Sequence, residues 1–502
     1  MNEDNSIGKE TFERRLNRET RPPNGQRLNL HSLRFAEVIK ISEVENLQKG
    51  FDRFFEERLH VKNALLFSSD QDNYRNFIAQ SRKVFLSMHS MYLQGFASKA
   101  YADRHKEGVI TRPVRELPIG VDSISFFLYQ MIPSSVIVVT QVEFDDSISD
   151  SLNKLFNAEY MELTEKHEDG TMSIFYPDRV KSLAIQDSLS RLQVMTESFV
   201  SKYFSGIFIS EITEVQIKCP SLKFFSLQDI PFSSSEALIK WMQDNRFFID
   251  MLGYAAVPSW TYQFNNEYLL FKDTSYQRKE KPMYVSILTS ESLFNTPGSY
   301  DGYGTPIWAV KHKHCYEFDS LMPLLAVGYL LQWHSRKLLT YRNSLDSDDK
   351  VTLGIDLRKQ YDSAYIAKAK INNDYFDFIR LRQELGEVIS ERFEPRLYNE
   401  TPMFELVKNQ NNLPHFAKEL VAVGNFLSDS IAKEYALLNE RYSDLFETMN
   451  TQSNFILNES NAKYQKSLAT LTWVLVVLTV MMLIAVVVQI VIAICSLPPP
   501  DP

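Results

Sequence analysis

Polar side chains interrupt an apolar run near the end of this sequence. Residues 468–494 contain no charged side chain, and the polar residues of interest within or just before them are Asn458, Asn461, Thr472, Thr479 and Gln489. Thr472 and Thr479 are seven residues apart, so they share one face of a helix, and Gln489 lies near that face. Polar groups in lipid favour a protein interior or a water-filled path. In a symmetric bundle, rings of these side chains would line a pore and act as partial ligands for hydrated cations.

The same residues also fit a plain membrane anchor. About 20 apolar residues cross a bilayer core, so residues 468–494 are long enough to span the lipid bilayer. In an anchor, the threonine hydroxyls bond back to carbonyls of their own helix and Gln489 reaches the interface. The sequence leaves both interpretations open, a pore-lining face and a simple tether.

Proline and charge set the topology expected for this span. No proline occurs between Pro414 and Pro498, which predicts one long helix that begins in water and continues into the membrane. Lys463 and Lys466 precede the span and no basic residue follows it, so the positive-inside rule places the N-terminal body in the cytoplasm. We therefore expect a single-pass protein of the inner (plasma) membrane.

The helix before the span carries a heptad pattern. Its seam residues alternate spacings of four and three, which is typical of a coiled coil. They are Ile431, Tyr435, Leu438, Tyr442, Leu445, Met449, Gln452 and Ile456. Such a seam needs a partner. Helices predicted at 324–343 and 355–392 of the same chain can supply one, and so can further copies around an axis; we expect a homo-oligomer of four or five copies.

A basic patch is the candidate ligand site in the body of the chain. It consists of Arg104, Lys106, Arg112 and Arg115, which flank a loop that contains a glycine. Guanidinium and ammonium groups grouped in this way suit the phosphates of a small nucleotide. The alternative interpretation is a charged surface loop.

Three other segments have plainer alternatives. Lys311–Cys315 alternates possible metal ligands along a strand-like stretch, which also fits a solvated edge strand. The Gly/Pro-rich residues 295–306 fit a binding loop or a surface turn. A set of aromatic residues suits stacking on a base or a half-buried strand: Trp260, Tyr262, Phe264 and Tyr268. Because none of the common hydrolase, NTPase, dinucleotide or zinc-enzyme motifs occurs, we expect no catalytic residues, no resident metal and no enzyme.

Composition narrows the class of protein. The 502 residues, 44% of them hydrophobic, are enough for two or three domains with real cores. The formal net charge of -9 argues against a surface that binds nucleic acid directly. Three scattered cysteines fit a reducing compartment and exclude a disulfide framework or a four-cysteine zinc site.

Hydrophobic periodicity predicts an α+β (α/β) cytoplasmic body, then an all-α region with a long stalk helix continuous with one transmembrane helix. Strands are expected at 123–130, 136–144, 222–227, 262–272 and 283–289, and helices at 44–59, 145–156, 178–204 and 233–252. After Pro323, helices are expected at 324–343, 355–392 and 403–409, and one more begins at Pro414. The residues SLDSDDK (344–350) are expected to end the first of these helices.

The expected domain boundaries follow from these elements. Residues 1–30 form a polar arm, 31–320 a sensing or binding domain, 321–413 supporting helices, 414–467 the stalk, 468–494 the transmembrane helix and 495–502 a short outer tail. The arm is interpreted as a short helix or a disordered segment that forms a solvated tail. Its four arginines, Arg14, Arg15, Arg18 and Arg21, give binding to anionic lipid headgroups as the alternative.

The region from about residue 320 to 494 resembles the CorA-type metal-ion channel family. Its closest stretch is NERYSDLFETMNTQSNFILNESNAKYQKSLATLTWVLVVLTVMMLI, an Asn-rich stalk end, a lysine and a Leu/Thr-rich entry to the span. The resemblance implies supporting helices, a pentameric stalk and Mg²⁺ or another divalent cation as the permeant ion. The Gly-Met-Asn loop and the second membrane helix of that family are missing from this sequence.

CorA-like membrane proteins of bacterial antiviral systems, including CRISPR-associated ones, resemble this architecture better. That likeness implies a body that senses a nucleotide messenger and a helix bundle that opens or perturbs the membrane. The first hypothesis is therefore a ligand-gated, channel-like oligomeric effector, plausible in antiviral defence. The alternatives are a single-anchor cytoplasmic scaffold or receptor, a CorA-type divalent-cation transporter and, with no motif to support it, a membrane-tethered enzyme.

Overall fold

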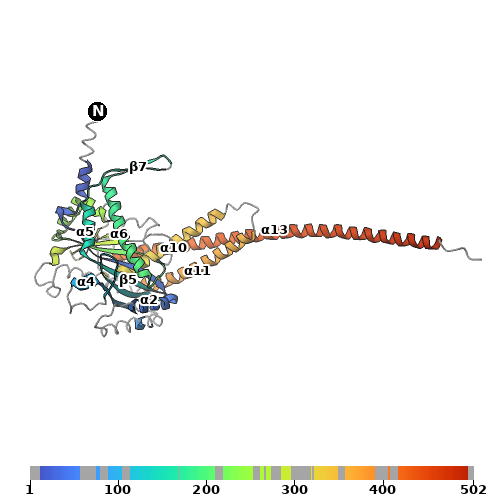
Figure 1. Ribbon diagram of the computed structural model, residues 1–502, viewed down its shortest axis with the longest axis horizontal. Helices are drawn as coiled ribbons and strands as arrows, with labels where there is room; N and C mark the ends of the chain where they lie inside the picture. Colours follow the sequence, from blue (N-terminus) through green and yellow to red (C-terminus); the bar gives the residue numbers. More distant parts are fainter. Residues whose placement is uncertain are drawn as a thin grey trace, which may run out of the picture. The chain divides into compact units, whose positions relative to one another are not determined.

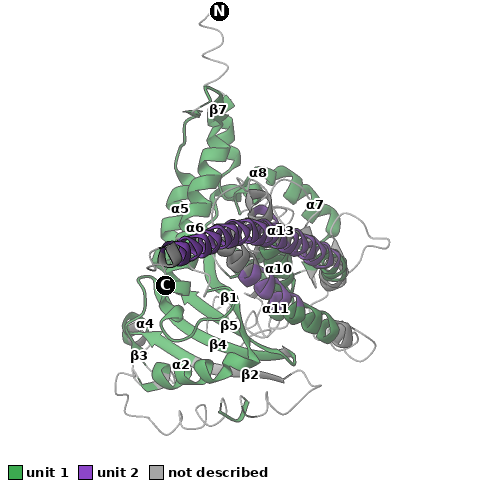
Figure 2. Ribbon diagram, turned by 90° about the vertical axis from the view of Figure 1, so that its right-hand side faces the viewer, with its two compact units in different colours: residues 1–339, 376–432 green, residues 340–375, 433–502 purple. Residues whose placement is uncertain are grey.

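The computed structural model describes residues 12–56, 75–77, 79, 89–104, 114–167, 169–209, 219–252, 261–264, 267–272, 284–294, 318, 321–348, 357–389, 405–406 and 416–495. The chain divides into two compact units, which Figure 2 shows in different colours. Unit 1 comprises Met1–Leu339 and Phe376–Ala432, and unit 2 comprises Thr340–Tyr375 and Lys433–Pro502.

A mixed β-sheet forms the centre of unit 1. Within the described residues it has ten strands in the order β12-β9-β10-β11-β8-β1-β5-β4-β2-β3. The strands are β1 (Asn29–Lys40), β2 (His89–Ser98), β3 (Val114–Arg115), β4 (Val121–Ile132), β5 (Ser135–Phe144), β8 (Ser221–Leu227), β9 (Thr261–Phe264), β10 (Tyr268–Lys272), β11 (Tyr284–Ser290) and β12 (Glu405–Leu406). Strand β1 pairs antiparallel with both β5 and β8, and all three are buried along almost their whole length. The sheet is therefore covered on both faces at its centre.

The predicted strand pair is confirmed as the hairpin β4–β5, in which Phe127 lies opposite Val139. Strand β5 leads directly into α5 (Asp146–Asn157), as predicted from the cap residues. The Asp145 carboxylate accepts a hydrogen bond from the backbone N–H of Ser147 at 2.9 Å, which satisfies one of the free donors at the helix start.

Replacing this cap tests its contribution to stability. We expect Asp145→Ala to lower the free energy of unfolding by about 1 kcal/mol, because an alanine accepts no bond from the helix start. The measurement is a urea titration of the detergent-solubilised chain followed by circular dichroism. Asp187→Ala removes only an exposed pair with Arg191, and its cost should stay below about 0.5 kcal/mol. Equal costs for the two variants would contradict the capping role.

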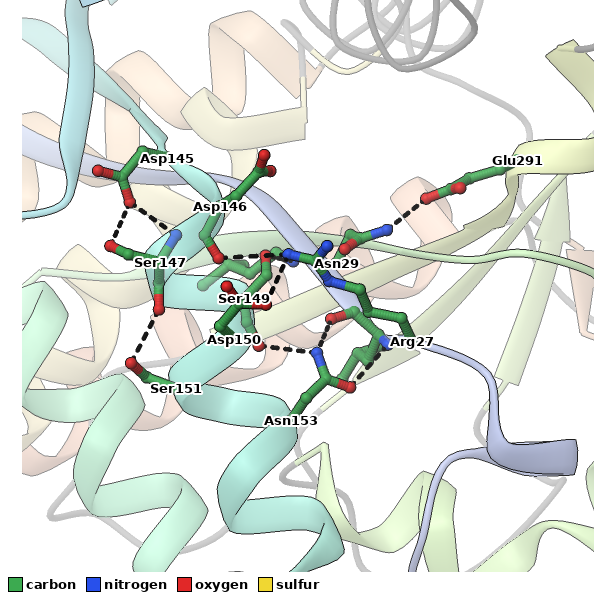
Figure 3. A network of polar contacts seen from close by, with 12 residues as sticks. Arg27, Asn29, Asp145, Asp146, Ser147, Ser149, Asp150, Ser151, Asn153 and Glu291 are labelled. Carbon is green, nitrogen blue, oxygen red and sulfur yellow. Dashed lines mark hydrogen bonds and ion pairs between the residues drawn. The ribbon is translucent and has the colours of Figure 1, made fainter. Parts of the chain in front are cut away.

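Polar side chains bond α5 to the start of β1 (Figure 3). The Asn153 amide accepts from the backbone N–H of Leu28 at 3.0 Å and donates to its carbonyl at 2.7 Å. The Ser149 hydroxyl accepts from the N–H of Leu30 at 3.0 Å. These bonds satisfy backbone groups of Leu28 and Leu30 where the chain enters the sheet. Helix α5 therefore fixes where β1 begins.

Aromatic side chains hold a helix against the sheet. In α2 (Val44–Glu56), Phe51 and Phe54 pack against Phe126 of β4, with ring centroids 5.6 and 4.9 Å apart. Phe54 also lies 4.2 Å from Phe96 of β2. Figure 2 shows α2 beside β2 and β4. The other helices of this part are α4 (Lys99–Arg104), α6 (Pro177–Ser201), α7 (Ser235–Asp244) and α8 (Arg246–Met251), with 3₁₀ turns at Pro23–Gly25, Ile41–Glu43 and Glu291–Phe294.

The N-terminal arm contains the expected short helix but is not the expected solvated tail. Residues 12–19 are helical, and Leu16 and Thr20 are buried. The buried Lys181 ammonium of α6 donates to the backbone carbonyl of Asn17 at 3.1 Å. Near this arm, β6 (Leu163–Lys166) and β7 (Met172–Phe175) form a separate hairpin beside the start of α6 (Figure 1). The arm is thus part of the folded body from residue 12 onward.

Several element boundaries also differ from the prediction. Residues 262–272 form two strands, β9 and β10, that pair with each other. The helix expected at 233–252 is broken at Asn245 into α7 and α8. The helix expected at 403–409 is wrong, because Glu405–Leu406 form strand β12. The expected break at 344–350 is also wrong as far as Asp348, where α10 ends. Short apolar stretches suit either element, so sheet pairing decides between them.

Three long helices complete the described chain. They are α10 (Leu321–Asp348), α11 (Leu357–Ile389) and α13 (Phe416–Cys495). The predicted single helix from the stalk into the apolar run is confirmed, because α13 runs unbroken over 80 residues. Together, the mixed α/β body and this helix confirm the coarse fold class.

Candidate functional site

The apolar part of α13 is a candidate membrane span. Within Gly424–Ile492 the helix is long and apolar enough to cross a bilayer by length and composition. None of its most apolar window is buried against the rest of the chain. Side chains such as Trp473 and Leu483 are more than 60% exposed, which in water would be costly for so long an apolar surface. Among the described residues, the chain therefore has one helix suited to a single crossing.

The five predicted pore residues fall on two positions of one heptad pattern. Asn458, Thr472 and Thr479 are spaced by multiples of seven, while Asn461 and Gln489 are 28 residues apart, and Asn461 follows Asn458 by three. In a supercoiled helix these two positions form a single seam. The structure places all five on the exposed helix α13. Gln465, seven residues after Asn458, belongs to the same seam. The sequence analysis missed this residue, although its heptad spacing from Asn458 could have revealed it.

We call this seam the polar stripe: Asn454, Asn458, Asn461, Gln465, Thr472, Thr479 and Gln489. At its upstream end, in unit 2, the same two heptad positions carry exposed acidic residues, among them Glu440, Asp444 and Glu447. The basic residues Lys463 and Lys466 belong to the other side of the helix. From Leu437 to Gln489, the stripe positions therefore contain no basic side chain.

The threonines of the span are satisfied within their own helix. The hydroxyl of Thr472 donates to the carbonyl of Leu468 at 2.8 Å, and that of Thr479 to the carbonyl of Leu475 at 2.7 Å. Thr470, two residues before Thr472, makes the same bond to Lys466 at 2.9 Å. This bonding is what the plain-anchor interpretation expects. Each hydroxyl oxygen still has a lone pair available as an acceptor, so the bonds leave the pore interpretation open.

The upper part of the predicted stalk seam is buried within one chain. Ile431, Tyr435, Leu438 and Tyr442 are at most 3% exposed. In unit 2, the Tyr435 ring lies 5.5 Å from Tyr375 of α11. Further down, Ile456 is 48% exposed, while the side chains of Leu445, Met449 and Gln452 lie outside the described part. Intrachain packing, the predicted alternative, therefore accounts for the first half of this seam.

The two seams occupy opposite sides of α13. Ile456 of the stalk seam and Asn458 of the polar stripe are two residues apart, about 200° around a helix. The supporting helices can therefore cover the stalk seam while the polar stripe stays open. Tyr341 of α10 is also buried in unit 2, where its hydroxyl donates a hydrogen bond to the carboxylate of Asp374. Burial and then this bond raise the pKa of Tyr341.

The basic patch is not assembled in the described residues. Arg104 ends α4, and Lys106 and Arg112 lie outside the described residues. The guanidinium of Arg115 lies over the rings of Phe96, Phe199 and Tyr203, at 5.5, 5.4 and 4.8 Å from their centroids. Cation–π contacts of this kind tie β3 to α6. Arg115 thus has a packing role, and its predicted contact with a phosphate stays a prediction.

The described residues bring none of the remaining sequence candidates together. Tyr268 is a core residue, fully buried and 5.0 Å from the ring of Phe318. Trp260, residues 295–306 and Lys311–Cys315 lie outside the described residues. In the part of the chain that the structure describes, no group of three or more His, Cys, Asp or Glu side chains is arranged to hold a metal ion.

Strand β1 carries buried charges toward both faces of the sheet, which the sequence analysis missed. Arg34 is 1% exposed, and its Nε donates to the Gln141 amide oxygen at 2.9 Å. Gln141 in turn donates to Glu143 at 3.2 Å, and the Ser123 hydroxyl donates to the same carboxylate at 2.6 Å. Burial of a charge requires such partners. This network therefore pins β1, β5 and β4 in register.

Glu37 of β1 occupies the opposite face and is held by backbone donors. Its Oε1 accepts from the N–H groups of Val38 and Phe208, each at 2.8 Å, and its Oε2 accepts from Ile209 at 2.7 Å. Glu37 is 1% exposed. Burial raises the pKa of this carboxyl to about 8, although the three backbone bonds act in the opposite direction.

A second buried carboxyl lies beside it. Glu197 of α6 is 4% exposed and accepts from the backbone N–H of Cys219 at 3.2 Å and from the Gln193 amide at 2.7 Å. The Cys219 sulfur is 4.0 Å from Glu37 Oε2, so this residue contacts both carboxyls. Burial, then the two carboxylates, raises the pKa of the Cys219 thiol well above its usual value. We call Glu37, Glu197, Gln193 and Cys219 the acid cluster.

Comparison of the chain with models of known protein families and with curated proteins gave no match. The polar stripe and the acid cluster are therefore interpreted from their own chemistry.

Proposed function

We propose that this chain is a single-pass membrane protein whose copies associate through the polar stripe, and that its cytoplasmic body controls a channel-like bundle of these helices. The observation that carries the proposal is the stripe itself. Its neutral amides and hydroxyls recur at heptad spacing along an exposed helix and continue into the apolar span. The CorA-like resemblance, the nucleotide ligand and the divalent cation remain predictions within this proposal.

Physical chemistry favours self-association along this stripe. An amide side chain is both donor and acceptor, so identical copies can bond to one another without a charge of opposite sign. Polar groups in hydrocarbon gain about 1–2 kcal/mol when they find a partner on another helix. One span per chain cannot enclose a path by itself, so a conducting bundle requires several copies.

A second candidate is a single anchor that only localises the body at the membrane. The burial of Tyr435 and Tyr442 within one chain favours it, because that seam then needs no further copy. The threonine back-bonds favour it as well, because they satisfy the span's hydroxyl donors inside one helix. The two candidates differ in one testable respect, the contact between copies at the polar stripe.

A pair of neighbouring threonines gives a matched test. Thr470 and Thr472 share residue type, depth and back-bond, but they face opposite sides of α13. In a chain whose Cys315 and Cys495 are replaced by serine, we expect oxidation in native membranes to cross-link Thr472→Cys into covalent dimers and to leave Thr470→Cys monomeric. Gel electrophoresis without reductant reads the result.

The cross-linking outcomes separate the two candidates. Equal cross-linking of both variants would indicate random collision, and no cross-link at Thr472→Cys or at Asn458→Cys would support the single anchor. The mass of the detergent-solubilised wild-type chain provides an independent check. Four or five copies fit the channel-like bundle, whereas a monomer or dimer rules out a pore with one span per chain.

A further inference from the structure

We propose that the acid cluster of unit 1 is a proton-dependent switch that holds the segment of residues 207–209 against β1 and thereby controls how α10 is held at this end of the sheet. The inference goes beyond the membrane function proposed above and does not depend on how α13 meets the bilayer. It rests on the contacts of Glu37 with the chain that follows α6.

The backbone of residues 207–209 is bonded to β1 through Glu37 and its neighbour Val38. The N–H of Ile207 donates to the carbonyl of Val38 at 2.8 Å, and the next two N–H groups donate to the Glu37 carboxyl. Gly206 permits this approach, because a Cβ there would lie 2.3 Å from the carbonyl oxygen of Val38. Glu37 therefore holds the backbone of residues 208 and 209, while Tyr203 and Phe204 before them pack against the rings of α2 and β4.

The segment in turn contacts α10. The ring of Phe208 lies 4.7 Å from Tyr329, and the Arg336 guanidinium lies 4.9 Å over the same tyrosine ring. Both α10 residues belong to unit 1, and α10 continues to Asp348. Displacement of Phe208 would remove an aromatic neighbour from Tyr329. A change at Glu37 would therefore reach the part of α10 that belongs to unit 1.

Among the described residues, Glu197 of α6 and Cys219, just before β8, face Glu37. Tyr329 of α10 interacts with these two groups in turn, and Arg336 of the same helix bonds to Tyr329. Burial raises the pKa of Tyr329 to about 12, and that of the Cys219 thiol is also raised, so neither group titrates between pH 6 and 8. Arg336 supplies a positive charge on the Tyr329 side. Of these groups, Glu37 is therefore the one that titrates close to this range.

Linkage gives the direction of the effect. The pKa of Glu37 is about 8 when the cluster is closed, against 4.5 for the exposed group. A carboxyl that binds its proton more tightly in the closed state stabilises that state fully below the exposed pKa, and loses this contribution as pH rises through the closed-state pKa. Opening of the segment to water is thus favoured at higher pH. Between pH 6 and 8 the opening equilibrium should increase roughly fifty-fold.

Hydrogen exchange of the full-length protein in detergent tests the switch. Deuterium uptake is measured by mass spectrometry at pH 6 and pH 8 and corrected for the intrinsic pH dependence of amide exchange. We expect the amides of Phe208 and Ile209 to open roughly fifty-fold more often at pH 8. Amides of the β4–β5 hairpin serve as the control and should show no such change. Equal opening of Phe208 and Ile209 at both pH values would overturn the proposal.

Two variants assign the effect to the cluster. Glu37→Gln has no proton to exchange, so its ratio of opening at the two pH values should fall to about one. If that variant does not fold, Glu197→Gln keeps Glu37 and removes the facing charge. It should lower the pKa of Glu37 and reduce the ratio below that of the wild type. A wild-type ratio in either folded variant would refute the assignment to Glu37 and Glu197.

Discussion

The Gly206→Ala substitution is expected to destabilise unit 1 by about 3 kcal/mol, the upper end of overpacking costs. The added Cβ would lie 2.3 Å from the carbonyl oxygen of Val38 and 2.7 Å from both Cγ and Oε1 of Glu37. The nearest of these atoms is sheet backbone and cannot move aside. The segment must shift away, and Glu37 then loses the N–H groups of Phe208 and Ile209. The measurement is the urea midpoint of the detergent-solubilised chain.

A second glycine gives the matched control. Gly424 lies in α13, and a Cβ there would meet only a side-chain atom of Leu331, at an ordinary 3.6 Å. Gly424→Ala should therefore be neutral or stabilise the chain by up to about 1 kcal/mol, because alanine is the better helix former. If Gly206→Ala were as stable as Gly424→Ala, the segment would have room to move, and its attachment to Glu37 would be loose.

The elements that the sequence predicted well are those with local signals. The β4–β5 hairpin follows from two β-branched runs joined by a short turn, and α5 follows from the Asp145 cap. The helix α13 follows from a long stretch without proline and an uncharged apolar run. Each of these signals lies within a few residues of the element it specifies, so no tertiary information is needed.

Strand β1 escaped prediction for a physical reason. Its sequence places Arg34 and Glu37 among apolar residues, and buried charges are rare unless they are paired. Their partners lie far along the chain, at Gln141 for Arg34 and at Phe208 and Ile209 for Glu37. Only the tertiary structure joins such positions. The acid cluster could not be predicted from the sequence for the same reason. The polar stripe could be predicted in part, because its heptad spacing is a local pattern.

The stalk seam shows a different limit. Heptad spacing at Tyr435 and Tyr442 predicted that these residues need a partner, and both are buried. The pattern cannot tell a partner helix in the same chain from one in another copy, because either buries the same face. The structure covers this part of the seam with helices of the same chain. That leaves the polar stripe, on the other side of α13, as the surface available to further copies.

If the polar stripe lines a path through the membrane, Thr479→Leu combined with Gln489→Leu should abolish most of the protein's effect on membranes. Each polar partner in hydrocarbon is worth about 1–2 kcal/mol, so losing two layers predicts a fall in flux of at least about tenfold. Apolar rings at these depths would also favour dewetting of a narrow path. The measurement is release of potassium from proteoliposomes that contain equal amounts of either protein.

The control for the threonine part of this variant is Thr470→Leu, which removes a back-bonded threonine hydroxyl from the opposite side of the helix. It should keep the wild-type flux, because that side faces lipid or the supporting helices whichever candidate holds. Wild-type flux in the double variant would show that the stripe lines no path, and cross-linking at Thr472→Cys would then describe packing alone. Loss of flux in both variants would indicate a general requirement for polarity in the span. Only loss confined to the stripe variant places the path on the face that runs from Asn454 to Gln489, because the control removes a threonine hydroxyl from the opposite side of the same helix.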